Sequence, residues 1–238
     1  MCTVVIRVPE GTGEPVRMLA VRDEDPARAW DPLGSWWPDR PGTVGVRDRL
    51  AGGAWLAARP ADGRVAVIVN RAGEPDLPAE RIESRGAIAL DAVAGRAPSG
   101  PRTRGFHLVE IDGGAAAVTT WDGAELRRRA LAPGTHMVAH DEPDDPATAR
   151  IAAWRDAFAD AATEGEPWWD AWAGVLARSA ALDPRDDRSI IRDNRPHGYP
   201  TMSLLACVAS VAEGAADVRY AELARPGAWN TLSFAAPA

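Results

Sequence analysis

The residues with the clearest capacity for chemistry lie at the start of the chain: a thiol at Cys2 and three consecutive charged residues, Arg22, Asp23 and Glu24. If the initiator Met is removed, Cys2 becomes the N-terminal residue and carries both a thiol and a free α-amino group. An α-amino group titrates near pH ~8, so it can accept the proton of its own side chain. A thiol that titrates near ~8.5 is a good nucleophile. This combination predicts N-terminal-nucleophile chemistry.

A predicted hairpin brings these residues together. Two short apolar and β-branched runs are separated by residues 9–15, which are rich in turn formers. The two runs are Thr3 to Val8 and Met18 to Val21. If the hairpin is symmetric about its loop, Cys2 lies opposite Arg22. Arg22 would then lower the pKa of the thiol and hold a substrate carboxylate or carbonyl, while Asp23 would orient the new ammonium group.

A purely structural interpretation of the same residues is also open. Cys2 can be a small residue that begins an edge strand, and residues 22–24 can form a solvated turn. The other cysteine, Cys207, lies in an apolar stretch that favours a buried, inert thiol.

Composition sets limits on the class of protein. The 238 residues, 46% hydrophobic and 26% charged, predict a single domain spanning 1–238. A net charge of -7 argues against nucleic acid or an anionic membrane as the main partner. No apolar run reaches the ~18 to 20 residues of a membrane span, and the start lacks signal-peptide features, so we expect a cytoplasmic location. The oligomeric state is open. No metal-binding spacing is present.

Further along the chain, a second hairpin is predicted from residues 53–59 and 64–70. Its pairing sets Asn70 opposite Gly53, where a strand-end amide can serve as an oxyanion donor or simply form a turn. Residues 25–45 are predicted to be irregular and to place Trp36 over an apolar surface as a substrate wall or a core seal.

The remaining pattern alternates between strands and helices. We predict a short helix over 87–94, a β-meander, two helices, a charged surface loop over 183–197 and a final hairpin. The meander strands are 106–111, 116–121, 125–131 and 135–139, the helices 144–163 and 167–181, and the hairpin strands 201–212 and 218–223. Asp144 or Asp145 is expected near the cap of the first long helix. This order is compatible with an α+β fold of two packed antiparallel sheets with helices outside.

Several short motifs together resemble the transport and Golgi organisation protein 2 family, also called the NRDE family. The motifs are Met1-Cys2-Thr3, Arg22-Asp23-Glu24, Leu50 to Leu56, Asn70-Arg71 and Ser84-Arg85-Gly86. They keep the family's order over roughly the first ninety residues, and the resemblance is weaker beyond. The family resembles N-terminal-nucleophile (Ntn) hydrolases of the bile-salt hydrolase and penicillin acylase kind, which implies a four-layer αββα sandwich.

The resemblance also implies roles for individual residues. Cys2 would be the nucleophile, Arg22 and Asp23 its partners, and Asn70 an oxyanion or substrate contact. Substrate contacts are expected from the neighbouring motif and loop residues Trp36, Trp55, Arg71 and Arg85.

Two departures from the family pattern bear on these roles. Val21 replaces the family's Asn before Arg-Asp-Glu. His140 stands where related sequences tend to have Asn, so it would supply the second oxyanion donor.

The leading hypothesis is a cysteine Ntn hydrolase that cleaves a non-peptide amide of a small molecule and needs no metal or cofactor. The alternative is a haem or hydrophobic-ligand carrier on the same fold, because family members have been linked to haem handling. Ten Trp and the four His (His107, His136, His140 and His197) can support non-covalent haem contact, and no CxxCH motif is present. A third possibility is a protein with no small-molecule role.

Overall fold

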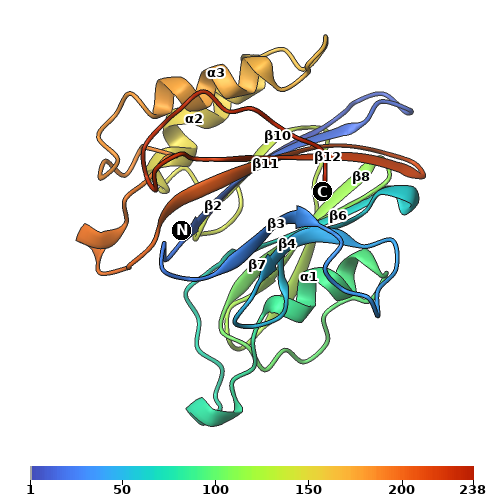
Figure 1. Ribbon diagram of the computed structural model, residues 1–238, viewed down its shortest axis with the longest axis vertical. Helices are drawn as coiled ribbons and strands as arrows, with labels where there is room; N and C mark the ends of the chain where they lie inside the picture. Colours follow the sequence, from blue (N-terminus) through green and yellow to red (C-terminus); the bar gives the residue numbers. More distant parts are fainter. Residues whose placement is uncertain (1) are drawn as a thin grey trace.

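Two antiparallel β-sheets face each other at the centre of the molecule in the computed structural model, which describes residues 2–238 (Figure 1). The first sheet has five strands in the order β10-β1-β2-β11-β12. Its strands are β1 Thr3–Val8, β2 Val16–Glu24, β10 Gly134–Val138, β11 Met202–Ala212 and β12 Ala215–Glu222. All its pairings are antiparallel.

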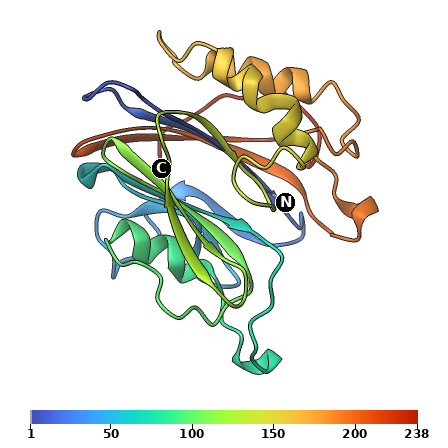
Figure 2. The same ribbon diagram turned by 180° about the vertical axis from the view of Figure 1, so that it is seen from behind.

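The second sheet has seven strands in sequential order, β3 to β9. They are β3 Trp30–Gly34, β4 Val44–Asp48, β5 Ala54–Arg59, β6 Arg64–Asn70, β7 Phe106–Asp112, β8 Ala115–Trp121 and β9 Leu126–Ala130. Between β6 and β7 the chain makes a long excursion that carries the short 3-10 helix Ala79–Arg81 and projects from the body (Figures 1 and 2).

Helices cover the outer faces of both sheets. Helix α1 (Gly86–Val93) packs on the seven-stranded sheet, whereas α2 (Ala149–Asp160) and α3 (Asp170–Ser179) cover the five-stranded sheet. Three apolar clusters fill the three spaces between these four layers. The predicted αββα sandwich of two antiparallel sheets with helices outside is therefore confirmed.

The predicted first hairpin is confirmed in its register. Thr3 pairs with Val21 across β1 and β2, so the next residues outward, Cys2 and Arg22, lie at the same end of the hairpin. However, β1 lies between β10 and β2, and the exposed fractions of Arg22 and Asp23 are only 3% and 5%. The edge-strand and solvated-turn interpretation is therefore wrong.

The structure differs from the predicted strands at β3 and β10. The segment predicted to be irregular, residues 25–45, contains β3, which pairs with β4. The predicted last strand of the meander, β10, leaves the seven-stranded sheet and pairs with β1 instead. Its alternating side chains explain this, because Val138 packs between the sheets while Met137 packs under the helices.

The segment 183–197 was predicted to be a charged surface loop, and its central part is buried. Residues 189–194 have exposed fractions of 6% or less, including Arg192 and Asn194. Charged residues are buried here because they are paired: Arg192 contacts Asn194 Oδ1 at 2.9 Å and Asp187 Oδ1 at 2.9 Å.

The long helices are shorter than predicted, and neither Asp144 nor Asp145 caps α2, whose N-cap residue is Thr148. Asp144 has a φ of 65°, and its carboxylate instead accepts hydrogen bonds from His136 Nδ1 at 2.8 Å and the Met137 amide at 2.8 Å. The other ring nitrogen, Nε2, donates to the carbonyl of Ala132 at 2.8 Å. Two acceptors at the two nitrogens favour the imidazolium form of His136.

The hydrogen-bonded pair of His136 and Asp144 predicts a pH-dependent contribution to stability. It lies where the chain crosses from the seven-stranded to the five-stranded sheet through β10. The hydrogen bond that His136 donates to Asp144, and the negative charge of Asp144, raise the pKa of His136. A raised folded-state pKa stabilises the protein below the unfolded value of ~6.5, and this stabilisation is lost as pH rises through the folded value. We expect His136→Gln to lower the free energy of unfolding by about 1 kcal/mol at pH 5.5 and by clearly less at pH 9.

Urea unfolding at both pH values measures this difference. Asp144→Asn is the matched partner for a double-mutant cycle, because Asn tolerates the left-handed backbone of residue 144. A pH-independent cost of His136→Gln would contradict the assignment.

Candidate active site

The thiol of Cys2 is buried against the backbone of Asp23. Its side chain is 4% exposed, and Sγ lies 3.4 Å from the Asp23 amide nitrogen and 3.6 Å from the Asp23 carbonyl oxygen. The amide donates to the sulfur, and the thiol donates to the carbonyl. Burial is the main effect that raises the pKa of the Cys2 thiol, and the negative charge of Asp23 raises it further. The positive charge of Arg22 lowers it.

A buried network holds the carboxylate of Asp23 in place. Oδ1 accepts a hydrogen bond from Ser203 Oγ at 2.6 Å, and Oδ2 accepts one from Asn194 Nδ2 at 3.1 Å. Both partners are almost fully buried. Ser203 comes from β11, which pairs with β2, and Asn194 comes from the segment before it. The network therefore fixes the orientation of the Asp23 carboxylate, whose charge acts on the thiol.

A second buried cation, Arg150, approaches the same end of β1 from helix α2. Its Nη1 donates to Thr3 Oγ1 at 3.1 Å, and its Nη2 lies 3.2 Å from His140 Nδ1. Burial, with the charge of Arg192, lowers its pKa to about 10, while Asp23 and Cys2 oppose this change. Arg150 therefore adds a guanidinium to the electrostatic surroundings of Cys2.

Three of these residues, Asn194, Ser203 and Arg150, were not found by sequence analysis. A signal exists only for Arg150. It lies four residues before Trp154 and eight before Phe158, so it shares the apolar face of α2, where a cation needs a buried partner.

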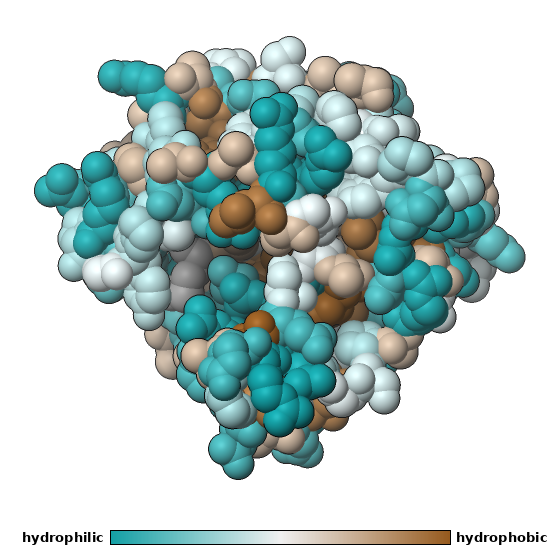
Figure 3. Space-filling model, turned by 60° about the horizontal axis from the view of Figure 1, so that its bottom comes forward, coloured by the Kyte–Doolittle hydropathy of each residue, from teal (hydrophilic) through white to brown (hydrophobic). Residues whose placement is uncertain are grey.

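A cavity of about 450 Å³ lies beside this end of the hairpin. It is lined by residues from β2, β4, β5, β6, the 71–85 excursion and the start of α1, and these include the predicted site residues Arg22, Trp55, Asn70 and Arg85. Cys2 is not itself a lining residue, but it shares the inter-sheet cluster with Trp55 and lies beside Arg22. The face from which the excursion projects is hollowed near its centre, with both hydrophilic and hydrophobic residues around it (Figure 3).

The wall of the cavity depends on a close contact between two glycines. A Cβ atom placed on Gly53 would lie 2.2 Å from the Cα of Gly86, and one placed on Gly86 would lie 2.8 Å from the Cα of Gly53. The Ser84-Arg85-Gly86 and Leu50 to Leu56 motifs therefore meet here. This contact sets the start of α1, and with it Arg85, against β5.

The other predicted site residues lie elsewhere. Trp36 is outside the cavity: its Nε1 donates to the carbonyl of Pro32 at 2.7 Å, and Arg47 covers its ring. Arg71 pairs with Glu142 at 2.8 Å. It follows Asn70 directly, and successive residues at the end of an extended strand point to opposite sides.

His140 lines a separate cavity of about 240 Å³, together with Arg150 and Asn194. Its Nε2 lies 3.2 Å from Asp141 Oδ2. Burial, with the charge of Arg150, lowers the pKa of His140. The structure therefore does not bring His140 and Asn70 into one cavity.

Within the described residues 2–238, no group of three or more His, Cys, Asp or Glu side chains could hold a metal ion. Nor is any helix there long and apolar enough to cross a membrane.

The two facing antiparallel sheets between outer helices, with a cysteine at the head of an inner strand, define an αββα sandwich. The chain belongs to the Transport and Golgi organisation 2 family, whose model matches residues 1–166. The resemblance inferred from the motifs is thus confirmed.

Comparison with solved structures finds a likeness to the Caenorhabditis elegans ortholog of N-acylethanolamine-hydrolyzing acid amidase. The TM-score is 0.46 and the sequence identity 11%, with 87% of this chain and 92% of that chain covered. No curated protein matches the chain.

Proposed function

We propose that this protein is a cysteine Ntn hydrolase that cleaves a non-peptide amide bond of a small molecule. The observation that carries the proposal is the position of the Cys2 thiol, which is held by the backbone of Asp23 and lies at the same end of the hairpin as Arg22, a residue that lines the cavity. Family membership over residues 1–166 includes all three residues.

The proposed reaction begins after Met1 has been removed. The free α-amino group of Cys2 accepts the thiol proton, and Arg22 stabilises the thiolate, whose formation burial otherwise opposes. The thiolate attacks the amide carbonyl carbon, and the C–N bond breaks as the ammonium returns its proton to the leaving amine. Water then hydrolyses the thioester, which releases the acid and restores the thiol.

Other side chains support this chemistry by position. The carboxylate of Asp23, fixed by Ser203 and Asn194, orients the α-ammonium group. Asn70 lines the cavity, where its amide can donate a hydrogen bond to the oxyanion. His140 lies in the other cavity, so we assign it no role in this step.

The proposal is tested with Met1-free protein and a panel of fatty-acyl, amino-acyl and β-lactam amides. We expect at least one amide to release its amine in a one-to-one ratio with its acid at neutral pH. Protein that retains Met1 is the matched control and should be inactive, because its α-amine is no longer on Cys2. Equal activity of the two forms would exclude the proposed base.

The haem-carrier alternative finds little support at the cavity. No His, Cys, Met or Tyr is among its lining residues within the described chain. His136 uses both ring nitrogens in hydrogen bonds, and His107 is fully buried and bonded to Thr120. The residues present thus do not fit a bound haem at this site.

We therefore expect haem titration at micromolar concentrations to give no Soret shift that depends on a histidine. Absorption spectra of the wild type and of His140→Ala test this expectation, because His140 is the most accessible of the three histidines on or beside the sheets. A shift that His140→Ala abolishes would favour the carrier function instead.

A further inference from the structure

The charges that line the cavity are not balanced. Four arginines (Arg22, Arg28, Arg85 and Arg104) face three acidic residues (Glu24, Asp48 and Glu83), which leaves a net charge of plus one. Most of the cations have an acidic partner: Arg28 pairs with Asp48 at 2.6 Å, and Arg104 pairs with Glu74 at 3.0 Å.

Arg85 differs from the others. Within residues 2–238 it makes no ion pair, and its Nη1 donates only to the carbonyl of Gly105 at 2.9 Å. Burial and the charge of Arg104 lower the pKa of Arg85. The charges of Cys2 and Glu24 raise it. A half-buried guanidinium without a carboxylate partner pays a desolvation cost that an anion would offset.

A second unsatisfied donor lies in the same lining. Arg22 is 3% exposed and pairs through Nη2 with Glu24 at 3.3 Å, but its buried Nη1 has no hydrogen-bond partner within the described chain. A buried donor that lacks a partner in the empty protein points to a ligand that supplies one.

We propose that the cavity takes a monoanionic amide, with a substrate carboxylate bound to Arg85 and assisted by Arg22, and with the amide carbonyl directed toward Cys2. This inference rests on the proposed function and names its substrate class. The excess of one positive charge matches a carboxylate better than a dianionic phosphate. The polar wall likewise fits an N-acyl amino acid or a dicarboxylic acid monoamide better than a long neutral acyl amide.

Two alkylating reagents of nearly equal size test the charge preference without knowledge of the substrate. Iodoacetate and iodoacetamide both form an S–C bond with the Cys2 thiolate and release iodide, but only iodoacetate carries a carboxylate. The measured quantity is the ratio of their rates at Cys2 in Met1-free protein, followed by peptide mass spectrometry. The reference is the same ratio for 2-mercaptoethanol.

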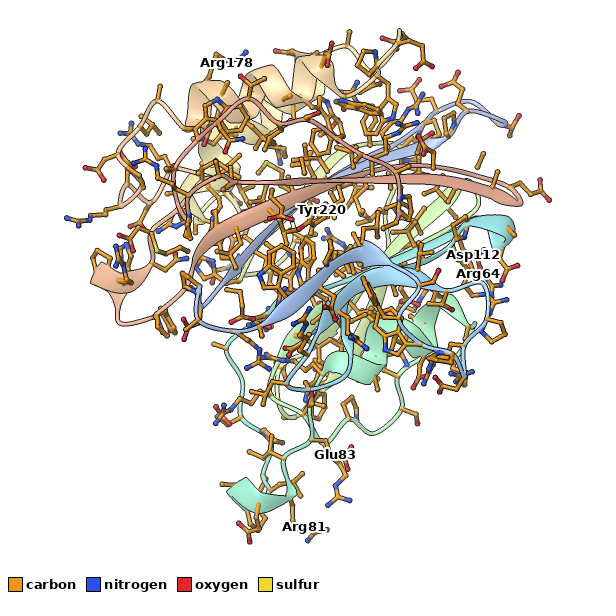
Figure 4. The ribbon with its side chains drawn as sticks, viewed as in Figure 1. Arg64, Arg81, Glu83, Asp112, Arg178 and Tyr220 are labelled. Carbon is orange, nitrogen blue, oxygen red and sulfur yellow. The ribbon has the colours of Figure 1, made fainter. Side chains whose placement is uncertain are left out.

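We expect the iodoacetate-to-iodoacetamide ratio at Cys2 to exceed the reference about tenfold and to shrink in 0.5 M NaCl. Arg85→Gln should lower the ratio about tenfold, whereas Arg85→Lys should keep most of it. Arg81→Gln is the matched control, because Arg81 lies at the exposed tip of the excursion and does not line the cavity (Figure 4). It should leave the ratio unchanged.

The outcomes separate the inference from the proposed function. Rapid labelling by iodoacetamide, with a ratio equal to the reference and indifferent to Arg85→Gln, would overturn the anionic substrate and leave the nucleophile intact. Failure of both reagents at Cys2 would overturn both proposals. Circular dichroism of each variant checks that it is folded. If Arg85→Gln does not fold, the inference is tested by the labelling ratio of Arg85→Lys, which should keep most of the wild-type value.

Discussion

Cys2→Ala should reduce amide turnover by about three orders of magnitude or more, to the uncatalysed background, for any substrate that the amide panel identifies. The variant removes the only protein atom that forms a covalent bond to the substrate in the proposed mechanism. It replaces a thiol with a hydrogen at a site that is 4% exposed, so we expect the fold to be retained. Steady-state release of amine measures the effect.

The matched control for this prediction is Cys207→Ala. Cys207 is fully buried in β11, and burial raises the pKa of its thiol far above the ordinary range, so it is not a nucleophile. Turnover by Cys207→Ala should stay within about twofold of the wild type. If Cys2→Ala stays active and Cys207→Ala does not, the assignment of the nucleophile is reversed.

Asp23→Ala should lower the free energy of unfolding by about 3 to 5 kcal/mol, more than any other variant proposed for this protein. The carboxylate is 5% exposed and accepts hydrogen bonds from Ser203 and Asn194, which would lose their partner inside the protein. Asp23→Asn should be intermediate, because its amide has one acceptor oxygen in place of two and can accept from only one of Ser203 and Asn194.

Urea or thermal unfolding measures both variants. Asp156→Ala is the control, because the side chain of Asp156 is 85% exposed on α2 and should change stability by less than about 0.5 kcal/mol. An equally small effect of Asp23→Ala would show that the network around residue 23 does not stabilise the fold.

Much of the site could be predicted from the sequence because it is built from local pairing. The loop at residues 9–15 fixes the register of β1 and β2, and this register alone places Cys2 beside Arg22. The second hairpin behaves in the same way. Leu56 pairs with Val67, and the same register, extended by three residues, sets Gly53 opposite Asn70.

The parts that sequence analysis missed depend on long-range contacts. Ser203 reaches Asp23 only because β11 pairs with β2 across an irregularity between Ser203 and Leu205. Asn194 belongs to a segment whose charges predict exposure, yet ion pairs and hydrogen bonds allow it to be buried. No local pattern encodes such partners.

Two further features of the structure are not evident from neighbouring residues, and each has a physical origin. Arg71 follows Asn70 in one motif, but alternation at the strand end directs it toward Glu142. β10 was predicted to continue the meander because successive strands usually pair, and here the chain crosses to the other sheet.

Whether Cys2 is a free N-terminal nucleophile is measured most directly by the mass of the purified protein before and after brief treatment with iodoacetamide. We expect a chain that begins at Cys2 and gains one carbamidomethyl group, located on Cys2 by peptide sequencing. A chain that retains Met1, with a label on Cys207 alone or with no label, would contradict this expectation.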